Sequence, residues 1–361
     1  MLKSDVSTRN NIIKLPGLVD THVHLREPGA TQKEDFESGT KAAIAGGYTQ
    51  LLDMPNNNPP TVSPQALLEK EKLAKGRIWC DLGFNFGASP SSVKYFQEVK
   101  KNVFGLKIYM NATTGPLIIE KDKDLENIFN SWTSKVPIMV HAIGETLDKA
   151  IKLAKKYDKP LHVCHVTADQ LKTIKKEKES GMQITCEVTP HHLFLNKSDE
   201  KRLKGCGIMK PPLLSKADQQ KLWDNLDVID TIATDHAPHT LEEKLANPPA
   251  FGVPGLETTL PLLFNAIAQE KLTTDLLIKM LATNPRRIFH LPEQKDTFVL
   301  VDFSETFEIN GSQMYTKNKW TPFEGMPGRG RVKKVAIRGK VVFAEGEFLN
   351  KPAGKIIHPT S

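Results

Sequence analysis

The sequence has few cysteines and no long apolar run, and both shortages restrict what the protein can be. Only four cysteines occur in 361 residues, and none forms a Cys-x-x-Cys pair. A disulfide scaffold is not expected at this length and density, which favours a reducing compartment. No apolar stretch reaches the length of a transmembrane helix, and the N-terminus has no signal-peptide core. We therefore expect a cytoplasmic protein with no membrane segment.

The charge balance is basic, with a formal net charge of +7 and a pI of about 9.0. Basic proteins often bind nucleic acid, but no motif or stripe of aromatic and basic residues supports that reading. The lysines are mixed with acidic residues on helix-like stretches such as 67–77 and 171–180, which are typical of solvated faces. We expect no nucleic-acid partner, and a modest positive field suits an anionic metabolite.

Apolar, strand-like segments alternate with helix-like segments along most of the chain. Such alternation predicts a parallel sheet, and eight units within about 290 residues favour a closed (β/α)8 TIM barrel. The expected strands are the opening segment after Gly17 and then 48–54, 79–86, 104–110, 137–142, 161–166, 183–188 and 229–235. The expected helices include 33–46, 63–75, 91–99, 144–156, 168–180, 258–268 and 274–281.

The texture changes near residue 291 to short β-like pieces. These pieces are 297–303, 332–338 and 341–343, and the residues from Lys351 onward read as an irregular tail. We expect 16–290 to form the barrel. Residues 1–15 and 291–361 should form a small β appendage, with 11–15 packing against the C-terminal strands.

Side chains that bind metals stand at the ends of several expected strands. They are His22, His24, Lys107, His141, His165 and Asp235. In a barrel these ends meet on one face, where active sites of this fold lie. Residues two apart on a strand point the same way, so His22 and His24 should present adjacent imidazoles, with Arg26 continuing the alternation. Neutral imidazoles suit a divalent metal such as zinc.

Lys107 is an unusual member of this set, because metals repel an ammonium ion. If its amine reacts with carbon dioxide, the resulting carbamate has two oxygens and could bridge two metals. The residues alone favour a simpler fate, in which Lys107 pairs with Asp235 or extends to solvent. A water bridging two metals would become a hydroxide near neutral pH, and Asp235 could shuttle the proton. Such a site hydrolyses, or in reverse closes, an amide-like bond.

Six motifs resemble those of the dihydroorotases in the amidohydrolase superfamily. They are His-Val-His-Leu-Arg-Glu-Pro-Gly (22–29), Asp-Met-Pro-Asn (53–56), Leu-Lys-Ile-Tyr (106–109), His-Val-Cys-His-Val (162–166), Glu-Val-Thr-Pro-His-His (187–192) and Thr-Asp-His-Ala-Pro-His (234–239). The resemblance runs from about residue 15 to the end. It is strongest to the dihydroorotase domain of the multifunctional pyrimidine-synthesis polypeptide of animals.

The resemblance implies a set of metal ligands. His22, His24 and Asp235 would hold a first zinc, His141 and His165 a second, and carboxylated Lys107 would bridge the two. A third zinc is implied near the second, held by Cys164 and Glu187 with His165 shared. Cys164 could equally be a small, buried core residue.

The resemblance also implies the substrate. It is L-dihydroorotate, formed reversibly from N-carbamoyl-L-aspartate in de novo pyrimidine biosynthesis. Its carboxylate would be held by Arg26, Asn56 and His239, since a guanidinium fork and an amide suit a carboxylate. Residues 111–115 match a mobile loop, whose Thr113 and Thr114 hydroxyls could close over the substrate. Lys210 either helps to bind the anion or is a solvated loop residue.

Two other readings are open. One is another cyclic amidohydrolase such as allantoinase, against which Arg26 argues. The other is an inactive dihydroorotase-like scaffold, against which the complete ligand set argues. The family resemblance further implies a homodimer, and other pyrimidine-pathway domains or enzymes as partners.

Overall fold

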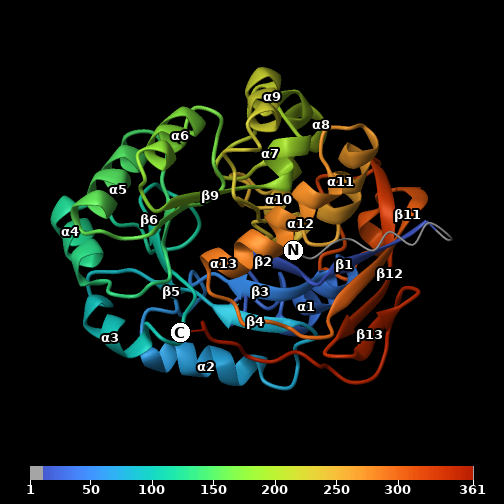
Figure 1. The fold of residues 1–361 in the computed structure, drawn as a ribbon, viewed down its shortest axis with the longest axis horizontal. Coiled ribbons are helices and arrows are strands. Elements are labelled where there is room, and N and C mark those ends of the chain that lie inside the picture. Colours follow the sequence, from blue (N-terminus) through green and yellow to red (C-terminus); the bar gives the residue numbers. More distant parts are fainter. Residues whose placement is uncertain (1–10, 361) are drawn as a thin grey trace.

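The computed structural model describes residues 11–360, and its centre is a barrel of parallel strands (Figure 1). In chain order the strands are β2 (Leu18–Val23), β3 (Tyr48–Asp53), β4 (Asp81–Phe84), β5 (Phe86–Gly87), β6 (Leu106–Tyr109), β7 (Ile138–His141), β8 (Leu161–Val163), β9 (Ile184–Val188) and β10 (Thr231–Ile232). Each strand pairs with the next one in the chain, except that β4 and β5 are not paired with each other. A bridge between Val23 and His236 joins the two ends of the series. The predicted TIM barrel is confirmed.

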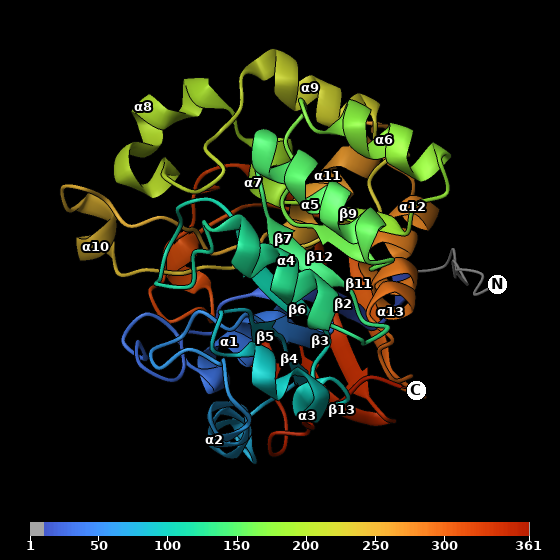
Figure 2. The ribbon, with the colours of Figure 1, turned by 90° about the vertical axis from the view of Figure 1, so that its left-hand side faces the viewer.

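Helices cover the outside of the barrel (Figures 1 and 2). They are α1 (Phe36–Ala45), α2 (Pro64–Ala74), α3 (Phe96–Val99), α4 (Asp122–Ser131), α5 (Glu145–Lys156), α6 (Leu171–Glu179), α7 (Pro190–Phe194), α8 (Glu200–Leu203), α9 (Lys216–Asp224), α10 (Leu241–Leu245), α11 (Thr259–Ala268), α12 (Thr274–Ile278) and α13 (Asn284–Ile288). Most of them turn an apolar face inward, whereas the residue that α10 buries is Lys244. In α5 the buried residues Leu147, Ala150, Ile151 and Ala154 recur at helical spacing, as packing on a sheet requires.

Several helix boundaries differ from those expected. The helix expected over 33–46 begins only at Phe36, because Asp35 caps it by accepting from the Ser38 backbone N–H at 2.8 Å. The segment 91–99 is a 3-10 turn (Val93–Tyr95) followed by α3. The helix expected over 274–281 is α12, which continues as a π-helix over Lys279–Thr283 into α13. Within residues 11–360, no helix is both long and apolar enough to cross a membrane.

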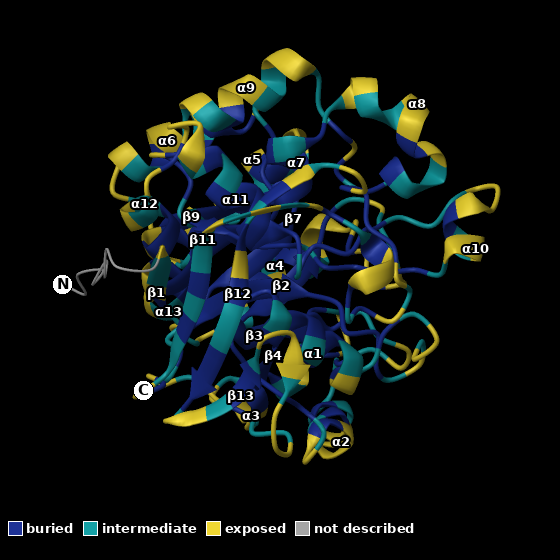
Figure 3. Cartoon of the chain, turned by 90° about the vertical axis from the view of Figure 1, so that its right-hand side faces the viewer, coloured by how far each residue is buried: buried dark blue, intermediate teal, exposed yellow. Residues whose placement is uncertain are grey.

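An antiparallel sheet from both ends of the chain packs beside the barrel (Figure 3). Its order is β1 (Ile12–Pro16), β11 (Phe298–Glu308), β12 (Pro327–Ile337), β13 (Lys340–Ala344) and β14 (Glu347–Phe348). This confirms the sheet of N- and C-terminal strands, although β11 and β12 are longer than expected. Residues 1–10 of the predicted appendage lie outside the described residues. The division into a barrel over 16–290 and a separate appendage stays a prediction.

The tail after β14 forms no regular helix or strand through residue 360, as expected, yet it is part of the barrel wall. Leu82 of β4 donates its N–H to the Lys355 carbonyl at 2.9 Å and accepts from the Ile357 N–H at 3.0 Å. The tail thereby pairs with the edge of β4 that no other strand covers in the described chain. Arg338 of the turn after β12 reinforces this junction through a 2.7 Å ion pair with Asp81.

Candidate active site

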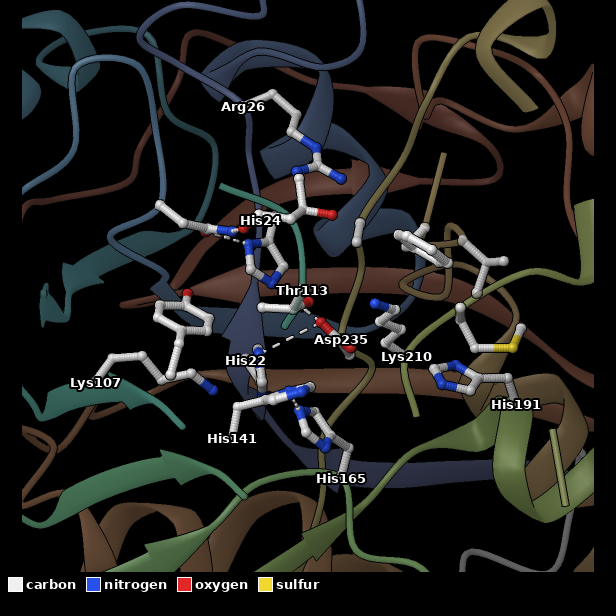
Figure 4. Close-up of a pocket in the computed structure, with 18 residues that line it drawn as sticks. His22, His24, Arg26, Lys107, Thr113, His141, His165, His191, Lys210 and Asp235 are labelled. Carbon is white, nitrogen blue, oxygen red and sulfur yellow. Dashed lines mark hydrogen bonds and ion pairs between the residues drawn. The ribbon is translucent and has the colours of Figure 1, made fainter. Parts of the chain in front are cut away.

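A pocket opens at the carboxyl ends of the barrel strands and gathers most of the predicted site residues (Figure 4). The predicted residues that line it are His22, His24, Arg26, Asn56, Lys107, Thr113, Thr114, His141, His165, Lys210 and Asp235. The strand-end reasoning selected His22, His24, Lys107, His141, His165 and Asp235, which lie together here although they are spread over more than 200 positions of sequence. The family resemblance selected Asn56, Thr113, Thr114 and Lys210.

His22, His24 and Asp235 form the first cluster. The Asp235 Oδ1 atom lies 3.4 Å from His22 Nε2 and 3.1 Å from His24 Nε2. One donor atom from each residue falls within 4.8 Å of the others. Burial raises the pKa of Asp235, but His22 and His24 outweigh it and hold the pKa well below its usual range. The cluster thus combines two histidines with an ionised carboxylate, a donor set that suits zinc, with the metal taking the place of the proton that the carboxylates favour on His22.

His141 and His165 form the second cluster, and their rings meet with His141 Nδ1 2.8 Å from His165 Nε2. The other nitrogen of each ring, His141 Nε2 and His165 Nδ1, is buried and has no hydrogen-bond partner in the described chain. Burial lowers the pKa of His141 to about 3 and that of His165 well below its usual value. Both rings are therefore neutral, as metal ligation requires.

Three site residues follow their strands in the left-handed backbone region. Arg26, His165 and Asp235 have φ values of 63°, 34° and 46°. Left-handed backbone is uncommon outside glycine, and it clusters at functional sites. The strands expected over 161–166 and 229–235 also end earlier than predicted, as β8 at Val163 and β10 at Ile232. Arg26 therefore reaches the pocket through a turn, and the prediction that it continues the β alternation is wrong.

Lys107 lies on β6 and is fully buried. Its amine is 2.9 Å from Cys164 Sγ and 5.2 Å from the centre of the Tyr109 ring. Among the described residues, no carboxylate lies within ion-pair distance of Lys107. The side chain thus neither pairs with Asp235 nor extends to solvent, which were the two simpler fates. A buried ammonium beside imidazoles and a thiol is costly unless its charge is removed.

Cys164 and Glu187 lie together beneath this cluster. Glu187 contacts His22 Nδ1 through one oxygen and lies 3.1 Å from His162 Nε2 through the other. Donor atoms of His22, Cys164 and Glu187 fall within 4.8 Å of one another. Burial and Lys107 lower the pKa of His22, but Glu187 and Asp235 raise it to about 10. In this grouping the shared histidine is His22, whereas His165 contacts His141.

Arg26 and Asn56 also line the pocket, and Arg26 lies across it from His141 and His165 (Figure 4). Arg26 Nε donates to the Pro238 carbonyl at 3.0 Å. Asn56 accepts from His24 Nδ1 at 2.7 Å and donates to the Thr114 carbonyl at 3.2 Å, which ties it to the 111–115 loop. Because the neutral ring then carries its proton on Nδ1, the Nε2 atom of His24 that faces Asp235 has a free lone pair.

His239 is placed differently from Arg26 and Asn56. Its Nε2 atom lies 3.0 Å from Arg26 Nη2, and Lys33 donates to its Nδ1 at 3.2 Å. His239 is 2% exposed and is not among the residues that line the pocket of the described chain. In this structure His239 supports Arg26 from behind.

Lys210 lines the pocket together with Phe251 and His191, two residues that the sequence did not single out. Its amine donates to the Ala112 carbonyl at 3.0 Å and lies 4.3 Å from the centre of the Phe251 ring. His191 of α7 also lines the pocket, and its buried Nε2 has no partner among residues 11–360. His191 lies within the recognised 187–192 motif, but it follows a helix start, so the strand-end rule did not select it.

The donors fit a metal centre. Two groups of imidazole, carboxylate and thiol donor atoms converge. Three further imidazole nitrogens, those of His141, His165 and His191, are buried without partners in the described part of the chain. Unpartnered buried nitrogens are rare in folded proteins, and a bound cation would satisfy them. The residues present therefore suit a site for more than one zinc-like ion.

The comparisons with known proteins agree with this geometry. The Amidohydrolase family model matches residues 13–342. The chain is 37% identical to a dihydroorotase from Pyrococcus horikoshii, over 99% of this chain and 87% of that protein. It is 44% identical to the multifunctional protein CAD from Squalus acanthias, over 96% of this chain but only 16% of the relative.

Two solved structures share the fold. The L-hydantoinase (dihydropyrimidinase) of Arthrobacter aurescens matches with a TM-score of 0.90 and 26% identity, over 96% of this chain and 88% of that one. The inactive dihydroorotase-like domain of a Chaetomium thermophilum CAD-like multifunctional protein matches with a TM-score of 0.82 and 27% identity, over 96% of this chain and 99% of that one. From the family model and these relatives, the chain belongs to the amidohydrolase family, among its dihydroorotase members.

Proposed function

We propose that this protein is a zinc-dependent enzyme that interconverts N-carbamoyl-L-aspartate and L-dihydroorotate. The observation that carries the proposal is the position of the Arg26 guanidinium, in the pocket wall beside the imidazole and carboxylate clusters. A guanidinium fork binds a carboxylate strongly, and L-dihydroorotate has a carboxylate next to its cyclic amide. The pocket therefore offers an anion-binding group next to donors for hydrolytic metals.

The metal ligands in this proposal follow the two clusters. His22, His24 and Asp235 hold one zinc, His141 and His165 a second, and a third would use Cys164 and Glu187 with a histidine. The family resemblance implies His165 as that histidine, whereas in this structure His22 has a donor atom within 4.8 Å of those of Cys164 and Glu187. When bound, the zinc ions supply an activated water and polarise the carbonyl under attack.

Lys107 is proposed to carry a carboxylate on its amine. The ammonium first releases a proton, and the neutral amine then adds to carbon dioxide and releases a second proton. The product is an anion with two oxygens in place of a buried cation. The burial of Lys107 without a carboxylate partner supports this reaction, since bound metal cations would stabilise a buried anion and would repel a buried ammonium. The two oxygens would bridge the first and second zinc sites.

Asp235 is proposed as the proton carrier. Its contacts with His22 and His24 both use Oδ1, which leaves Oδ2 for the reaction. In ring opening, Asp235 takes a proton from the attacking water and returns it to the amide nitrogen as the carbon–nitrogen bond breaks. Ring closure runs the same transfers backward.

The remaining pocket residues are proposed to bind and enclose the substrate. Arg26 and Asn56 hold the carboxylate, with His239 supporting Arg26 and available to the anion after a small shift. Lys210 adds positive charge, and its bond to Ala112 links it to the loop that carries Thr113 and Thr114. Closure of that loop would exclude water.

An inactive scaffold is the competing reading, because one structural relative is described as inactive. Two observations weigh against it. The chain is more similar in sequence to the dihydroorotases than to that domain, and every predicted metal ligand is present and clustered. An allantoinase would have no use for Arg26 beside the metal donors.

Replacing Arg26 by glutamine tests the substrate assignment. We expect kcat/KM for L-dihydroorotate to fall by about a hundredfold, mainly through KM, because a charge-assisted bidentate contact is lost. Zinc content should not change. The matched control is Arg331→Gln on the antiparallel sheet. The Arg331 side chain is 44% exposed, so this variant should leave the kinetics unchanged.

The wild-type protein should turn over neither allantoin nor dihydrouracil well. Preference for either would overturn the assignment, as would zinc loss in Arg26→Gln without a binding defect.

The assembly and location of the protein stay predictions. We propose a homodimer, as the family resemblance implies, in the cytoplasm. The chain spans 16% of the length of its two multifunctional relatives. Association with other pyrimidine-pathway domains is therefore proposed as well.

A further inference from the structure

Lys244 on α10 is a buried ammonium with an unusual set of partners. Its Nζ donates to the carbonyls of Ile208 and Ala250 at 2.7 Å each, and to that of Gly252 at 2.9 Å. The side chain is fully buried. Among residues 11–360, no carboxylate lies within ion-pair distance of Lys244, whereas the buried Lys70 pairs with Asp53 at 2.6 Å. The charge of Lys244 is thus met by three backbone carbonyls and by the face of the Trp320 ring, whose centre lies 5.8 Å from Nζ.

The three carbonyls belong to two loops that form one wall of the pocket. Ile208 directly precedes Met209 and Lys210, which line the pocket. Gly252 and the preceding Phe251 line it as well. The loops also share a backbone bond from the Gly252 N–H to the Ile208 carbonyl at 3.1 Å. Lys210 lies over the Phe251 ring, so its place depends on both loops.

The crowding of this wall is built into the sequence. A Cβ atom at Gly205 would overlap the Lys244 carbonyl, and one at Gly252 would press on the Ala237 carbonyl. Gly252 also has a φ of +128°, which side chains rarely tolerate. Carbonyl dipoles that converge on one point repel one another, and a cation between them reverses that repulsion. Lys244 therefore adds to the direct Gly252–Ile208 bond in holding the two loops at this separation.

We propose that Lys244 is a positioning residue for substrate affinity, which sets the wall that places Lys210 against the anionic substrate. It does not touch the substrate, because it lies behind the lining residues. The inference rests on the proposed function, since it assumes that Lys210 faces an anion. It adds a residue that α10 contributes from outside the pocket.

The test is a double-mutant cycle on N-carbamoyl-L-aspartate kinetics. Lys244→Met is expected to raise KM by about tenfold with kcat changed less than about threefold, as loss of uniform binding predicts. Lys210→Met should raise KM by a similar factor, and the double variant should raise it no further, because both act through one contact. Lys244→Arg, which keeps the donors, should recover most of the affinity. Zinc content should stay constant throughout.

The matched control is Lys178→Met. Lys178 also donates to a backbone carbonyl, that of Val228 at 2.7 Å, but it lies away from the pocket. It should lose stability without a change in KM. Additive effects of the Lys244 and Lys210 changes, or a fall in kcat alone, would overturn the proposal.

Hydrogen exchange provides a readout that does not depend on turnover. In Lys244→Gln, a milder change that remains available if Lys244→Met does not fold, exchange should rise in peptides covering 205–213 and 250–255 and nowhere else. Unchanged exchange there would overturn the proposal. If the wild-type protein turns over neither compound, the proposed function fails, yet the exchange data still decide whether Lys244 holds the wall.

Discussion

Replacement of Lys107 by alanine is expected to lower turnover of N-carbamoyl-L-aspartate by at least about a thousandfold, the scale of a lost hydrolytic metal centre. Lys107 is the one proposed ligand that can link the two clusters. It is a fully buried residue of β6, and its amine lies 2.9 Å from Cys164 Sγ. Without it, the metal donors divide into two incomplete sets. Zinc content, measured on the same preparation, should fall below that of the wild-type protein.

Chemical rescue separates a bridging role from a packing role. A short carboxylic acid added to Lys107→Ala can occupy the space of the lost side chain and supply two oxygens. Part of the activity should return with such an acid and not with a neutral amide of equal size. Lys107→Met is the matched control, since it fills the site with an apolar chain and leaves no room for the acid. Full activity and full metal content in Lys107→Ala would refute the bridge.

Replacement of Asp235 by asparagine is expected to produce the second large effect. Loss of a proton carrier typically costs about 10²–10⁴-fold, and we expect kcat to fall toward the upper end. The amide keeps the shape of the side chain but neither accepts the proton nor carries the charge that His22 and His24 face. The first zinc site should weaken as well.

Asp230→Asn is the control for Asp235→Asn. Asp230 directly precedes β10, and it accepts from the Cys186 N–H at 2.8 Å and pairs with Lys178, away from the pocket. This variant should lose stability and keep kcat. If Asp235→Asn retained wild-type kcat with zinc bound, the acid–base role would have to pass to another group.

Much of the barrel and its metal-binding face could be predicted because periodicity and strand ends are local signals. Buried parallel strands read as apolar runs, and the ligand follows the run directly, as at His141 and Asp235. The backbone turns that aim Arg26, His165 and Asp235 were not predictable from that pattern. Left-handed geometry at a non-glycine residue leaves no mark in composition and is imposed by the surrounding packing.

Contacts between distant loops were the other features that sequence reasoning missed. Lys244 looks like one more charge on a short, polar helix, and its burial depends on where residues 205–213 and 250–253 fold. His239 resembled a substrate ligand, but its position behind Arg26 follows from contacts with Lys33 and with the Phe251 carbonyl. The tail after Lys351 read as irregular, and its pairing with Leu82 could not be inferred from a segment with no β pattern.

The most direct test of the account is to measure N-carbamoyl-L-aspartate turnover and zinc content on one sample of the whole protein, before and after metal removal. The account predicts turnover with two or more zinc ions per chain, loss of turnover when a chelator removes them, and recovery when zinc and bicarbonate are restored. Zinc-loaded protein that converts neither N-carbamoyl-L-aspartate nor L-dihydroorotate, or turnover that persists without metal, would contradict it.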